Sequence, residues 1–461
     1  MSDWTLCIDF GTAYSKAAAA PAGAWSRFDP AQVRPLMLSA HEGQGSAFLL
    51  DSAIFVDDDR VLFGRAAIAQ ANAQADTKRS ALRSFKTLLS VSDLDRALNT
   101  NAPATIDPHR IFQMRDLIVL YLAYLLASID RAAASDTMLA QAELTNRRYA
   151  APAWRSGDSA GMHQVIVKLF GEAEAFRAAV GKKLLAPEGM SLRTISDALP
   201  KAMDQAAPQD MGLVFEATAA AAYTSVGLEQ SASHMIVVDM GAGTTDIAAL
   251  ARLGPRAFEL PEARVTLKQA GDFIDRVIAN RVLDTAKWAR SREQKTELWT
   301  VLMRQIGDIK ETIFADGRAT LRNQGRSISL SQRDIEQDRD FREFVKALRE
   351  AYDHALAVVR DDAQARGRSE VQAIAVGGGA SAPFIQDLIH RKAGSTRPRV
   401  TPRPATPDWA RGGVFKGNLA PVFPQLAIAI GGALAPDAML AARSGVTRPA
   451  NDRSDTRAGR D

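Results

Sequence analysis

The feature that most constrains this chain is a strand that ends in aspartate and turns through glycine, and it occurs twice. Ile8-Asp9-Phe10-Gly11-Thr12 is similar to Val238-Asp239-Met240-Gly241-Ala242-Gly243-Thr244, and 230 positions separate the two aspartates. Each copy includes a short apolar run, which predicts strands over Thr5–Asp9 and Met235–Asp239. A duplicated domain explains the repeat, and a length of 461 residues suits two lobes of ordinary domain size.

The two turns offer the groups that a nucleoside triphosphate needs. Glycine lets the backbone approach a ligand closely, so consecutive N–H groups in such a turn can surround phosphate oxygens. A carboxylate beside the turn can hold Mg²⁺ directly or through its waters. We therefore expect Asp9 and Asp239 at a metal, with Thr12 and Thr244 at the phosphates. Either turn alone is also compatible with a purely structural turn, so the prediction of a phosphate site depends on both turns being present.

A third glycine turn follows another predicted strand, Ala373–Val376. Gly377, Gly378 and Gly379 leave a surface without side chains, which suits the face of an adenosine, and Ser381 lies just beyond them. The helix predicted to begin near Phe384 would favour a phosphate near its N-terminus. By itself this segment is a connection from strand to helix, in which glycine is common for packing alone.

The predicted fold is α/β with two lobes. Lobe I covers residues 1–227 and lobe II residues 228–440, with a subdomain inserted at about 272–345 and a disordered polar tail at 441–461. Periodicity and turn residues predict a strand region at Ala53–Phe63, helices at Ile111–Arg131, Ser159–Val180, Glu216–Val226, Asp272–Arg290, Ser291–Phe314 and Ser331–Arg366, and an extended loop at Arg397–Pro407.

Composition excludes several classes of protein. Apolar residues make up 46% and charged residues 24%, as in a globular protein with a large interior. The net charge of +4 is spread along the chain, so no nucleic-acid partner is expected. Cys7 is the single cysteine, which excludes an internal disulfide. The longest apolar run, Leu117 to Ala127, suits a core helix and is too short to span a membrane. Because the N-terminus also does not resemble a signal peptide, we expect a cytoplasmic protein without membrane insertion.

In order and spacing, the turns at Asp9, Asp239 and Gly377 resemble the first phosphate, second phosphate and adenosine motifs of the actin, sugar-kinase and heat-shock ATPase superfamily. Within it, the chain is most similar to the nucleotide-binding domain of the 70 kDa heat-shock (DnaK-like) chaperones. The resemblance covers about residues 5–435. It implies a two-lobed actin-like ATPase fold of duplicated ribonuclease H-like domains with inserted subdomains, and it implies ATP or ADP and Mg²⁺ as ligands.

Further segments carry this resemblance. Phe215-Glu216-Ala217-Thr218 looks like the segment whose glutamate helps to activate the attacking water, and Phe85-Lys86-Thr87 like the one that brings a lysine to the γ-phosphate. Ala151-Pro152-Ala153 is similar to the stretch whose proline relays the nucleotide state between lobes. The implied catalytic residues are Asp9, Lys86, Glu216 and Asp239. The implied nucleotide-binding residues are Gly11, Thr12, Ala13, Gly241, Ala242, Gly243, Thr244, Gly271, Lys310, Gly377, Gly378, Gly379 and Ser381.

The chain departs from the family pattern at several of these positions. Ala217 replaces a proline beside the glutamate, Ala242 replaces a glycine in the second turn, and Ser381 stands where an arginine often lies under the adenine. These changes predict slower or altered hydrolysis. Residues 443–461 are polar and carry no sign of the peptide-binding domain that follows in the chaperones, so we expect no such domain in this sequence.

Four functions are compatible with these motifs. The first is an ATPase switch, in which Mg-ATP closes the lobes and an unidentified protein partner reads the change. An actin-like polymerising or segregation ATPase is the main alternative, and a pseudo-ATPase scaffold that binds nucleotide without hydrolysis is another. A sugar or acetate kinase is the least supported, because no substrate pocket is recognisable in the sequence.

Overall fold

The computed structural model describes most of the chain, namely residues 3–26, 28–39, 46–74, 79–83, 85, 93–142, 144–152, 159–225, 233–253, 256–323, 325–391, 398–412, 415 and 419–440. Lys86, the predicted lobe boundary at residue 227 and the predicted tail at 441–461 lie outside these residues. The predicted α/β class is confirmed, because the described residues form two six-stranded sheets, a four-stranded sheet and a hairpin, together with the helices that cover them.

The first sheet is built on a hairpin. Strand β1 (Trp4–Phe10) pairs antiparallel with β2 (Tyr14–Pro21), and the register places Asp9 opposite Lys16. On its other side β1 pairs in parallel with β8 (Asn146–Ala151), which pairs in parallel with β10 (Met211–Phe215). Two short strands, β3 (Arg34–Pro35) and β4 (Leu50–Asp51), pair with β2. Three parallel strands therefore bring their carboxyl ends to one edge of this sheet.

The second sheet repeats this arrangement. Strands β11 (His234–Met240) and β12 (Thr245–Leu253) form a hairpin in which Asp239 lies opposite Asp246. Strand β11 also pairs in parallel with β17 (Glu370–Val376), which pairs with β18 (Arg399–Pro402). Strands β13 (Arg256–Glu259) and β14 (Val265–Leu267) pair with β12. The hairpins that hold Asp9 and Asp239 thus occupy equivalent places in two sheets, as the sequence repeat predicts.

Both central strands are buried on two faces, and their alternate residues face different cores. In β1, Ile8 packs in the core formed with the helices of the first sheet, whereas Cys7 packs in a core that both sheets share. In β11 the same alternation separates Val238, in the second sheet's own core, from Val237, in the shared core. Because side chains alternate along a strand, the two aspartates at the strand ends lie on the faces turned toward the shared core.

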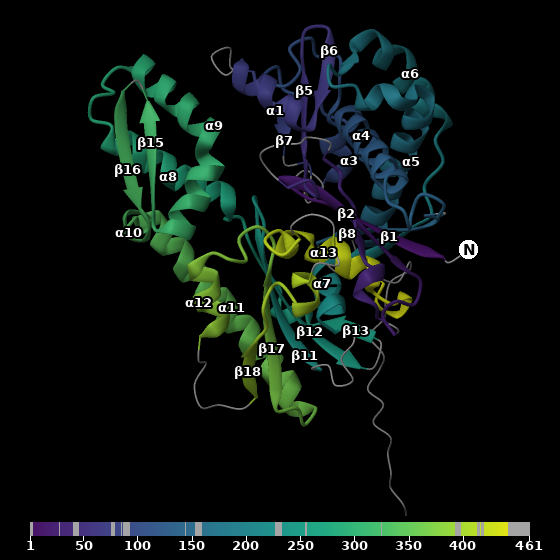
Figure 1. Ribbon diagram of the computed structural model, residues 1–461, viewed down its shortest axis with the longest axis vertical. Helices are drawn as coiled ribbons and strands as arrows, with labels where there is room; N and C mark the ends of the chain where they lie inside the picture. The colour runs from purple at the N-terminus through teal and green to yellow at the C-terminus, as the bar shows by residue number, and fades with distance from the viewer. Residues whose placement is uncertain are drawn as a thin grey trace, which may run out of the picture.

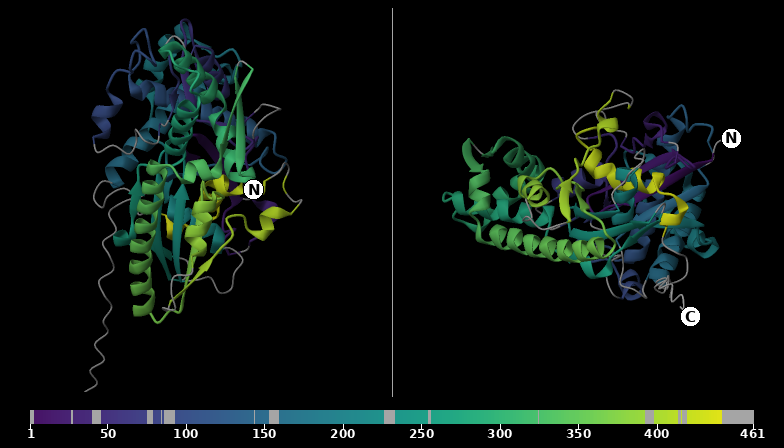
Figure 2. Two further views of the ribbon diagram at one scale, coloured as in Figure 1. Left: turned by 90° about the vertical axis from the view of Figure 1, so that its left-hand side faces the viewer. Right: turned by 90° about the horizontal axis from the view of Figure 1, so that it is seen from below.

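Helices cover the outer faces of the sheets (Figure 1). Over the first sheet α4 (Met114–Ala134) packs on α5 (Ser159–Val180), which packs on α6 (Leu192–Gln205), and the short α3 (Leu94–Leu98) contacts α4. Over the second sheet lie α12 (Pro383–His390) and α11 (Arg339–Ala365). Helix α11 is the long green helix at the lower left of the left-hand view in Figure 2. Helix α4 is long and apolar enough to cross a membrane, but most of it is buried inside the protein, as the prediction of a core helix requires.

Two smaller units stand on the sheets at the same end of the molecule (Figure 1). One consists of α1 (Gly64–Ala73) with the strands β5 (Ala53–Val56), β6 (Arg60–Phe63), β7 (Leu82–Arg83) and β9 (Met190–Ser191). The other consists of α8 (Gly271–Thr285), α9 (Arg292–Asp316), α10 (Gln332–Glu336) and the hairpin of β15 (Arg318–Asn323) and β16 (Arg326–Ser331). Arg304 of α9 donates a hydrogen bond to the carbonyl of Asn72 in α1 at 2.5 Å, which joins the two units.

Two helices of small residues lie in the shared core, α7 (Glu216–Ser225) and α13 (Phe423–Leu434). They pack closely, because a Cβ on Gly431 would lie 1.9 Å from the carbonyl oxygen of Ala219. A Cβ on Gly432 would lie 2.3 Å from the Sγ of Cys7 in β1. Helix α13 contacts β1, β2 and β17, so this C-terminal helix links both sheets.

The end of α13 is fixed to β8 by a buried arginine. The Arg148 guanidinium, in a side chain that is 2% exposed, donates hydrogen bonds to the carbonyls of Gly432 at 3.0 Å and Ala435 at 2.5 Å, and it pairs with Asp437 at 2.6 Å. A cation at this position also complements the negative end of the helix dipole. Burial lowers the pKa of Arg148, and the charge of Asp437 opposes that shift.

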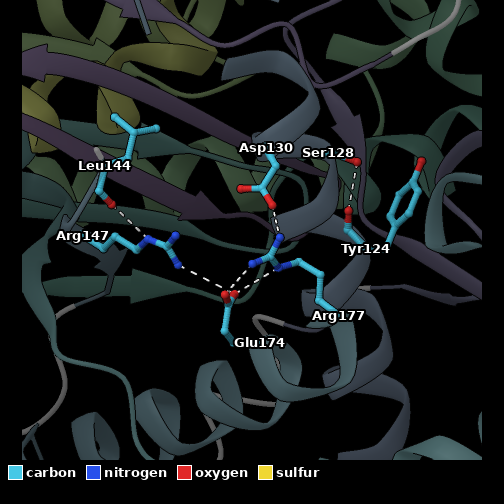
Figure 3. A network of polar contacts seen from close by, with 7 residues as sticks. All are labelled: Tyr124, Ser128, Asp130, Leu144, Arg147, Glu174 and Arg177. Carbon is cyan, nitrogen blue, oxygen red and sulfur yellow. Dashed lines mark hydrogen bonds and ion pairs between the residues drawn. The ribbon is translucent and has the colours of Figure 1, made fainter. Parts of the chain in front are cut away.

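On its other face, β8 is tied to α4 and α5 by a polar network (Figure 3). Arg147 donates a hydrogen bond to the carbonyl of Leu144 at 3.1 Å and lies 3.8 Å from the carboxylate of Glu174. Arg177 of α5 donates to Glu174 at 3.1 Å and also pairs with Asp130 of α4. Strand β8 is therefore anchored to helices on both sides of the sheet.

Two predicted elements need correction. The predicted helix Ser331–Arg366 is divided into α10 and α11, because Asp338 caps α11 by accepting hydrogen bonds from the N–H groups of Asp340 and Phe341 at 2.9 and 3.3 Å. The predicted loop Arg397–Pro407 contains β18, whose backbone pairs with β17. Helix α5 has the predicted bounds.

Gly431→Ala is expected to lower the free energy of unfolding by about 1–3 kcal/mol, because the added Cβ would meet the Ala219 carbonyl. The matched control is Gly307→Ala in α9, where nothing lies within 4 Å of the added Cβ. That control should raise stability by about 0.5–1 kcal/mol, since alanine is the better helix residue. Chemical denaturation measures both values, and equal effects would contradict the close packing of α7 on α13.

Candidate functional site

The first turn holds a buried ion pair. Asp9 is 3% exposed, and its Oδ2 accepts a hydrogen bond from the Nζ of Lys16 at 2.6 Å. The ammonium lies against the turn, because a Cβ on Gly11 would lie 3.0 Å from Lys16 Nζ and 2.2 Å from the Tyr14 carbonyl oxygen. The sequence prediction missed Lys16. The hairpin could have revealed this residue, since its register places Lys16 opposite Asp9.

Three buried hydroxyl groups form hydrogen bonds with one another beside the first turn. The Oγ atoms of Ser15 and Ser52 lie 3.0 Å apart, and the Tyr121 hydroxyl donates to Ser15 at 3.0 Å. Burial raises the pKa of Tyr121, so its phenol stays protonated and able to donate. The N–H of Ser52 donates to the carbonyl of Ala13 at 2.9 Å, which fixes the far side of the turn.

An aromatic cluster places the segment that precedes Lys86. Phe85 is fully buried, and its ring stacks on Tyr121 with 4.6 Å between centroids. Phe10, the neighbour of Asp9, lies 5.7 Å from the ring of Phe85. Phe85 is thus anchored beside the first turn. Lys86 lies outside the described residues, so its place at a γ-phosphate stays a prediction.

Two further predicted residues lie at the same edge of the first sheet. Pro152 directly follows β8, and Glu216 begins α7 directly after β10, where it is 5% exposed. Because β1, β8 and β10 are parallel neighbours, Asp9, Pro152 and Glu216 follow adjacent carboxyl ends. The N-terminus of α7 also favours a carboxylate at Glu216 through the helix dipole. The structure therefore brings Glu216 to the same edge as Asp9.

The second turn is held at both ends. The N–H of Gly241 donates to the carbonyl of Thr244 at 3.0 Å, and the N–H groups of Gly271 and Asp272 donate to the carbonyls of Gly241 and Ala242 at 3.2 and 2.8 Å. These last two bonds fix the turn to the start of α8. Gly271, predicted to bind nucleotide, thus contacts the turn through its backbone.

A hydroxyl contact distinguishes the second hairpin from the first. Asp246, opposite Asp239, accepts hydrogen bonds from Thr244 Oγ1 at 2.8 Å and from Thr266 Oγ1 at 2.6 Å. The equivalent position of the first hairpin is Lys16, which binds its aspartate directly. The two hairpins are therefore equivalent in backbone and different in charge.

The third turn packs directly on the second. Gly377 has a φ of +83°, which favours glycine, and a Cβ there would lie 2.4 Å from Asp239 Oδ1. The N–H of Gly379 donates to the Met240 carbonyl at 2.9 Å. Around Gly378 the space is open, with Gln425 Nε2 4.0 Å from an added Cβ. Asp239 and the predicted adenosine turn are thus neighbours, with Ser381 exposed just beyond.

Lys310 completes the second-lobe side of the site. Its ammonium pairs with Asp275 at 2.8 Å and donates to the Gly271 carbonyl at 3.3 Å. Burial raises the pKa of Asp272, and the charge of Asp275 raises it further, whereas Lys310 and then Arg83 lower it. Lys310 therefore lies beside the segment that fixes the second turn.

Electrostatic contacts cross between the lobes near the first turn. Burial raises the pKa of Tyr14, as do the nearby charges of Asp51 and of Glu311 in α9, while Arg83 lowers it. Arg83 also acts on the pKa of Asp272 in α8. Tyr14 and Arg83 belong to the first lobe, and Glu311 and Asp272 to the second. A charge from α9 therefore acts on Tyr14 after the first turn, and a charge from β7 acts on Asp272 beside the second turn.

Asp239 is the better candidate for a magnesium ligand, because Asp9 is already paired with the Lys16 ammonium. Among the described residues, no group of three or more His, Cys, Asp or Glu side chains could hold a metal alone. Mg²⁺ is commonly held by one or two carboxylates, waters and substrate phosphates. Gly377 keeps the space beside Asp239 clear of a side chain. At Asp9 the adjacent space holds the Lys16 ammonium.

Residues 198–404 match the family model described as Hsp70 protein. Over these residues the chain is similar to the Hsp70 family. The match covers slightly less than half of the chain and includes Glu216, Asp239 and the turn at Gly377. A comparison with curated proteins gave no match. The family match supports the actin-like ATPase fold and a nucleotide-binding function of the Hsp70 kind.

The first turn lies outside the segment that matches the Hsp70 family. Asp9 and Lys16 precede residue 198, so their assignment rests on the equivalence of the β1–β2 and β11–β12 hairpins. The roles given to individual residues stay predictions. What the geometry adds is their grouping: Asp9 with Glu216 at one sheet edge, and Asp239 with Gly377 and Gly379 at the other.

Gly377→Ala is expected to lower the free energy of unfolding by about 1–3 kcal/mol. The residue would have to adopt a positive φ, and its Cβ would displace Asp239. Gly378→Ala is the matched control and should change stability by less than about 0.5 kcal/mol, because its Cβ meets open space. Denaturation curves of the two variants measure this, and equal stabilities would contradict the packing of the third turn on Asp239.

Proposed function

We propose that this protein binds ATP or ADP with Mg²⁺ between its lobes and acts as a nucleotide-controlled switch for a protein partner. The observation that carries the proposal is the placement of Asp9 and Asp239 at equivalent hairpin ends, on sheet faces that are both turned toward the shared core. Two carboxylates and two glycine turns on facing lobes suit one metal and one chain of phosphates. The Hsp70 family match over residues 198–404 supports nucleotide as the ligand.

Each predicted residue has a role in this proposal. Bound Mg²⁺ would neutralise the charge that develops on the phosphates. Asp9 and Asp239 would hold it directly or through waters, while the N–H groups of the two turns bind phosphate oxygens. Glu216 would orient the attacking water, and Lys86 would contact the γ-phosphate. The adenosine would lie against Gly377–Gly379, with Lys310 on its other side.

The switch depends on how the lobes are joined. Helices α7 and α13 pack closely between the sheets, with Gly431 against Ala219 and the ring centroids of Tyr223 and Phe423 5.3 Å apart, so a movement of one helix would be passed to the other. Strand β8, which ends at Ala151 directly before Pro152, is fixed to α5 by Arg147 and to α13 by Arg148, so a movement of α13 would reach Pro152. A protein partner would read this movement. Sedimentation of the protein in the presence of ATP alone would instead favour a filament-forming ATPase.

Glu216→Gln is expected to reduce steady-state phosphate release by roughly 10²–10⁴-fold, because the amide cannot accept the proton of the attacking water. ATP affinity should change less than about threefold, since Glu216 does not contact the metal in this proposal. Glu336→Gln on the exposed surface of α10 is the control. Wild-type protein that binds ATP and releases no phosphate would contradict the hydrolytic role and indicate a scaffold.

Asp239→Asn is expected to weaken Mg-ATP binding at least about tenfold, because the metal loses a charged partner. Asp9→Asn should act in the same direction. The control is Asp204→Asn, which removes an exposed carboxylate from α6. Isothermal titration calorimetry gives the three affinities. Wild-type affinity in both site variants would remove the assignment of this site.

A further inference from the structure

Tyr121 of α4 contacts both ends of the first turn. The turn covers residues 11–13, and Phe10 and Ser15 form the last pair of the hairpin before it. The Tyr121 ring stacks on Phe10 with 5.8 Å between centroids, and the Tyr121 hydroxyl donates to Ser15 Oγ at 3.0 Å. A single side chain from a buried helix therefore holds the pair of residues at which the turn is closed.

Ser52 extends this contact to the middle of the turn. Its Oγ lies 3.0 Å from Ser15 Oγ and 3.3 Å from the Tyr121 hydroxyl, and its N–H donates to the carbonyl of Ala13 at 2.9 Å. Ser15, Ser52 and Tyr121 are all fully buried. Buried hydroxyls that lose their partners are strongly unfavourable, so the three stay bonded to one another and fix the turn to α4.

The backbone N–H groups of the turn are left free. Among the residues that the structure describes, no acceptor is bonded to the N–H groups of Gly11, Thr12 or Ala13. Consecutive N–H groups can surround phosphate oxygens only while the backbone keeps one conformation. Because glycine permits many backbone conformations, a turn that contains Gly11 needs support from outside itself.

We propose that Tyr121 is a positioning residue of the first turn, which keeps the free N–H groups in the arrangement that binds phosphates. This inference rests on the proposed nucleotide-binding function. Tyr121 is fully buried, so it acts through Ser15 and Phe10 and not by contact with the ligand. Loss of its hydroxyl should therefore weaken ligands that carry phosphates. It should leave the nucleoside unaffected, because adenosine is expected at Gly377–Gly379 in the second lobe.

The test measures the Kd of Mg-ATP and the Kd of adenosine by isothermal titration calorimetry. Tyr121→Phe removes the hydroxyl and keeps the ring that stacks on Phe10. It should raise the Kd of Mg-ATP at least about fivefold, as expected for one hydrogen bond, and change the Kd of adenosine less than about twofold. Tyr352→Phe in α11 is the matched control and should leave both constants unchanged. Tyr352 is also buried, and within the described part of the chain its hydroxyl forms no hydrogen bond.

A second variant keeps the test valid if the tyrosine variant does not fold. Ser15→Ala removes only the acceptor at the end of the turn, so it should raise the Kd of Mg-ATP in the same way. The double variant should bind no more weakly than the weaker single variant, because both changes break the same contact. Equal weakening of Mg-ATP and adenosine, or wild-type affinities in both single variants, would overturn the role of Tyr121. Wild-type protein that binds no Mg-ATP would contradict the proposed function itself, and the role of Tyr121 would fail with it.

Discussion

Gly431 brings the backbone of α13 against that of α7, and Gly432 makes room for the Cys7 side chain of β1. The site depends on this contact, because it sets how the two sheets lie against each other, and these sheets carry Asp9 and Asp239 at their hairpin ends. A residue with a Cβ at either position would separate the sheets. Arg148 fixes the same helix at its far end by binding the carbonyls of Gly432 and Ala435. The two contacts hold α13 between the sheets.

Duplication explains the backbone of the site and leaves its chemistry asymmetric. Both halves offer a strand that ends in aspartate, a glycine turn and a returning strand in the same register. In the first half, Lys16 fills the position opposite the aspartate, and buried Tyr121 and Phe85 support the turn. In the second half, Gly377 and Gly379 pack on the turn and its aspartate without side chains. The first half thus pairs its aspartate with a positive charge, while the second packs glycine backbone against its aspartate.

The elements that could be predicted from the sequence are those that depend on short-range patterns of residues. The aspartate strands, the glycine turns and the bounds of α5 follow from apolar periodicity and turn residues within a few positions of each other. The division between α10 and α11 was missed, although Asp338 carries the signal of a helix cap. Lys16 was missed because its partner is set by hairpin register. The bond between Arg304 and Asn72 could not be foreseen, because it joins residues 232 positions apart that only the packed lobes bring together.

The account requires that nucleotide changes the arrangement of the two lobes, and a distance measured across them tests this most directly. Spin labels at Ala69→Cys in α1 and Met303→Cys in α9 would sit on exposed surfaces of the two units that Arg304 and Asn72 join. Native Cys7 is fully buried, and burial raises the pKa of its thiol, so it should not take up label. Double electron–electron resonance should give a shorter and narrower distance distribution with Mg-ATP than without nucleotide. The same distribution in both states, at saturating ATP, would contradict the switch.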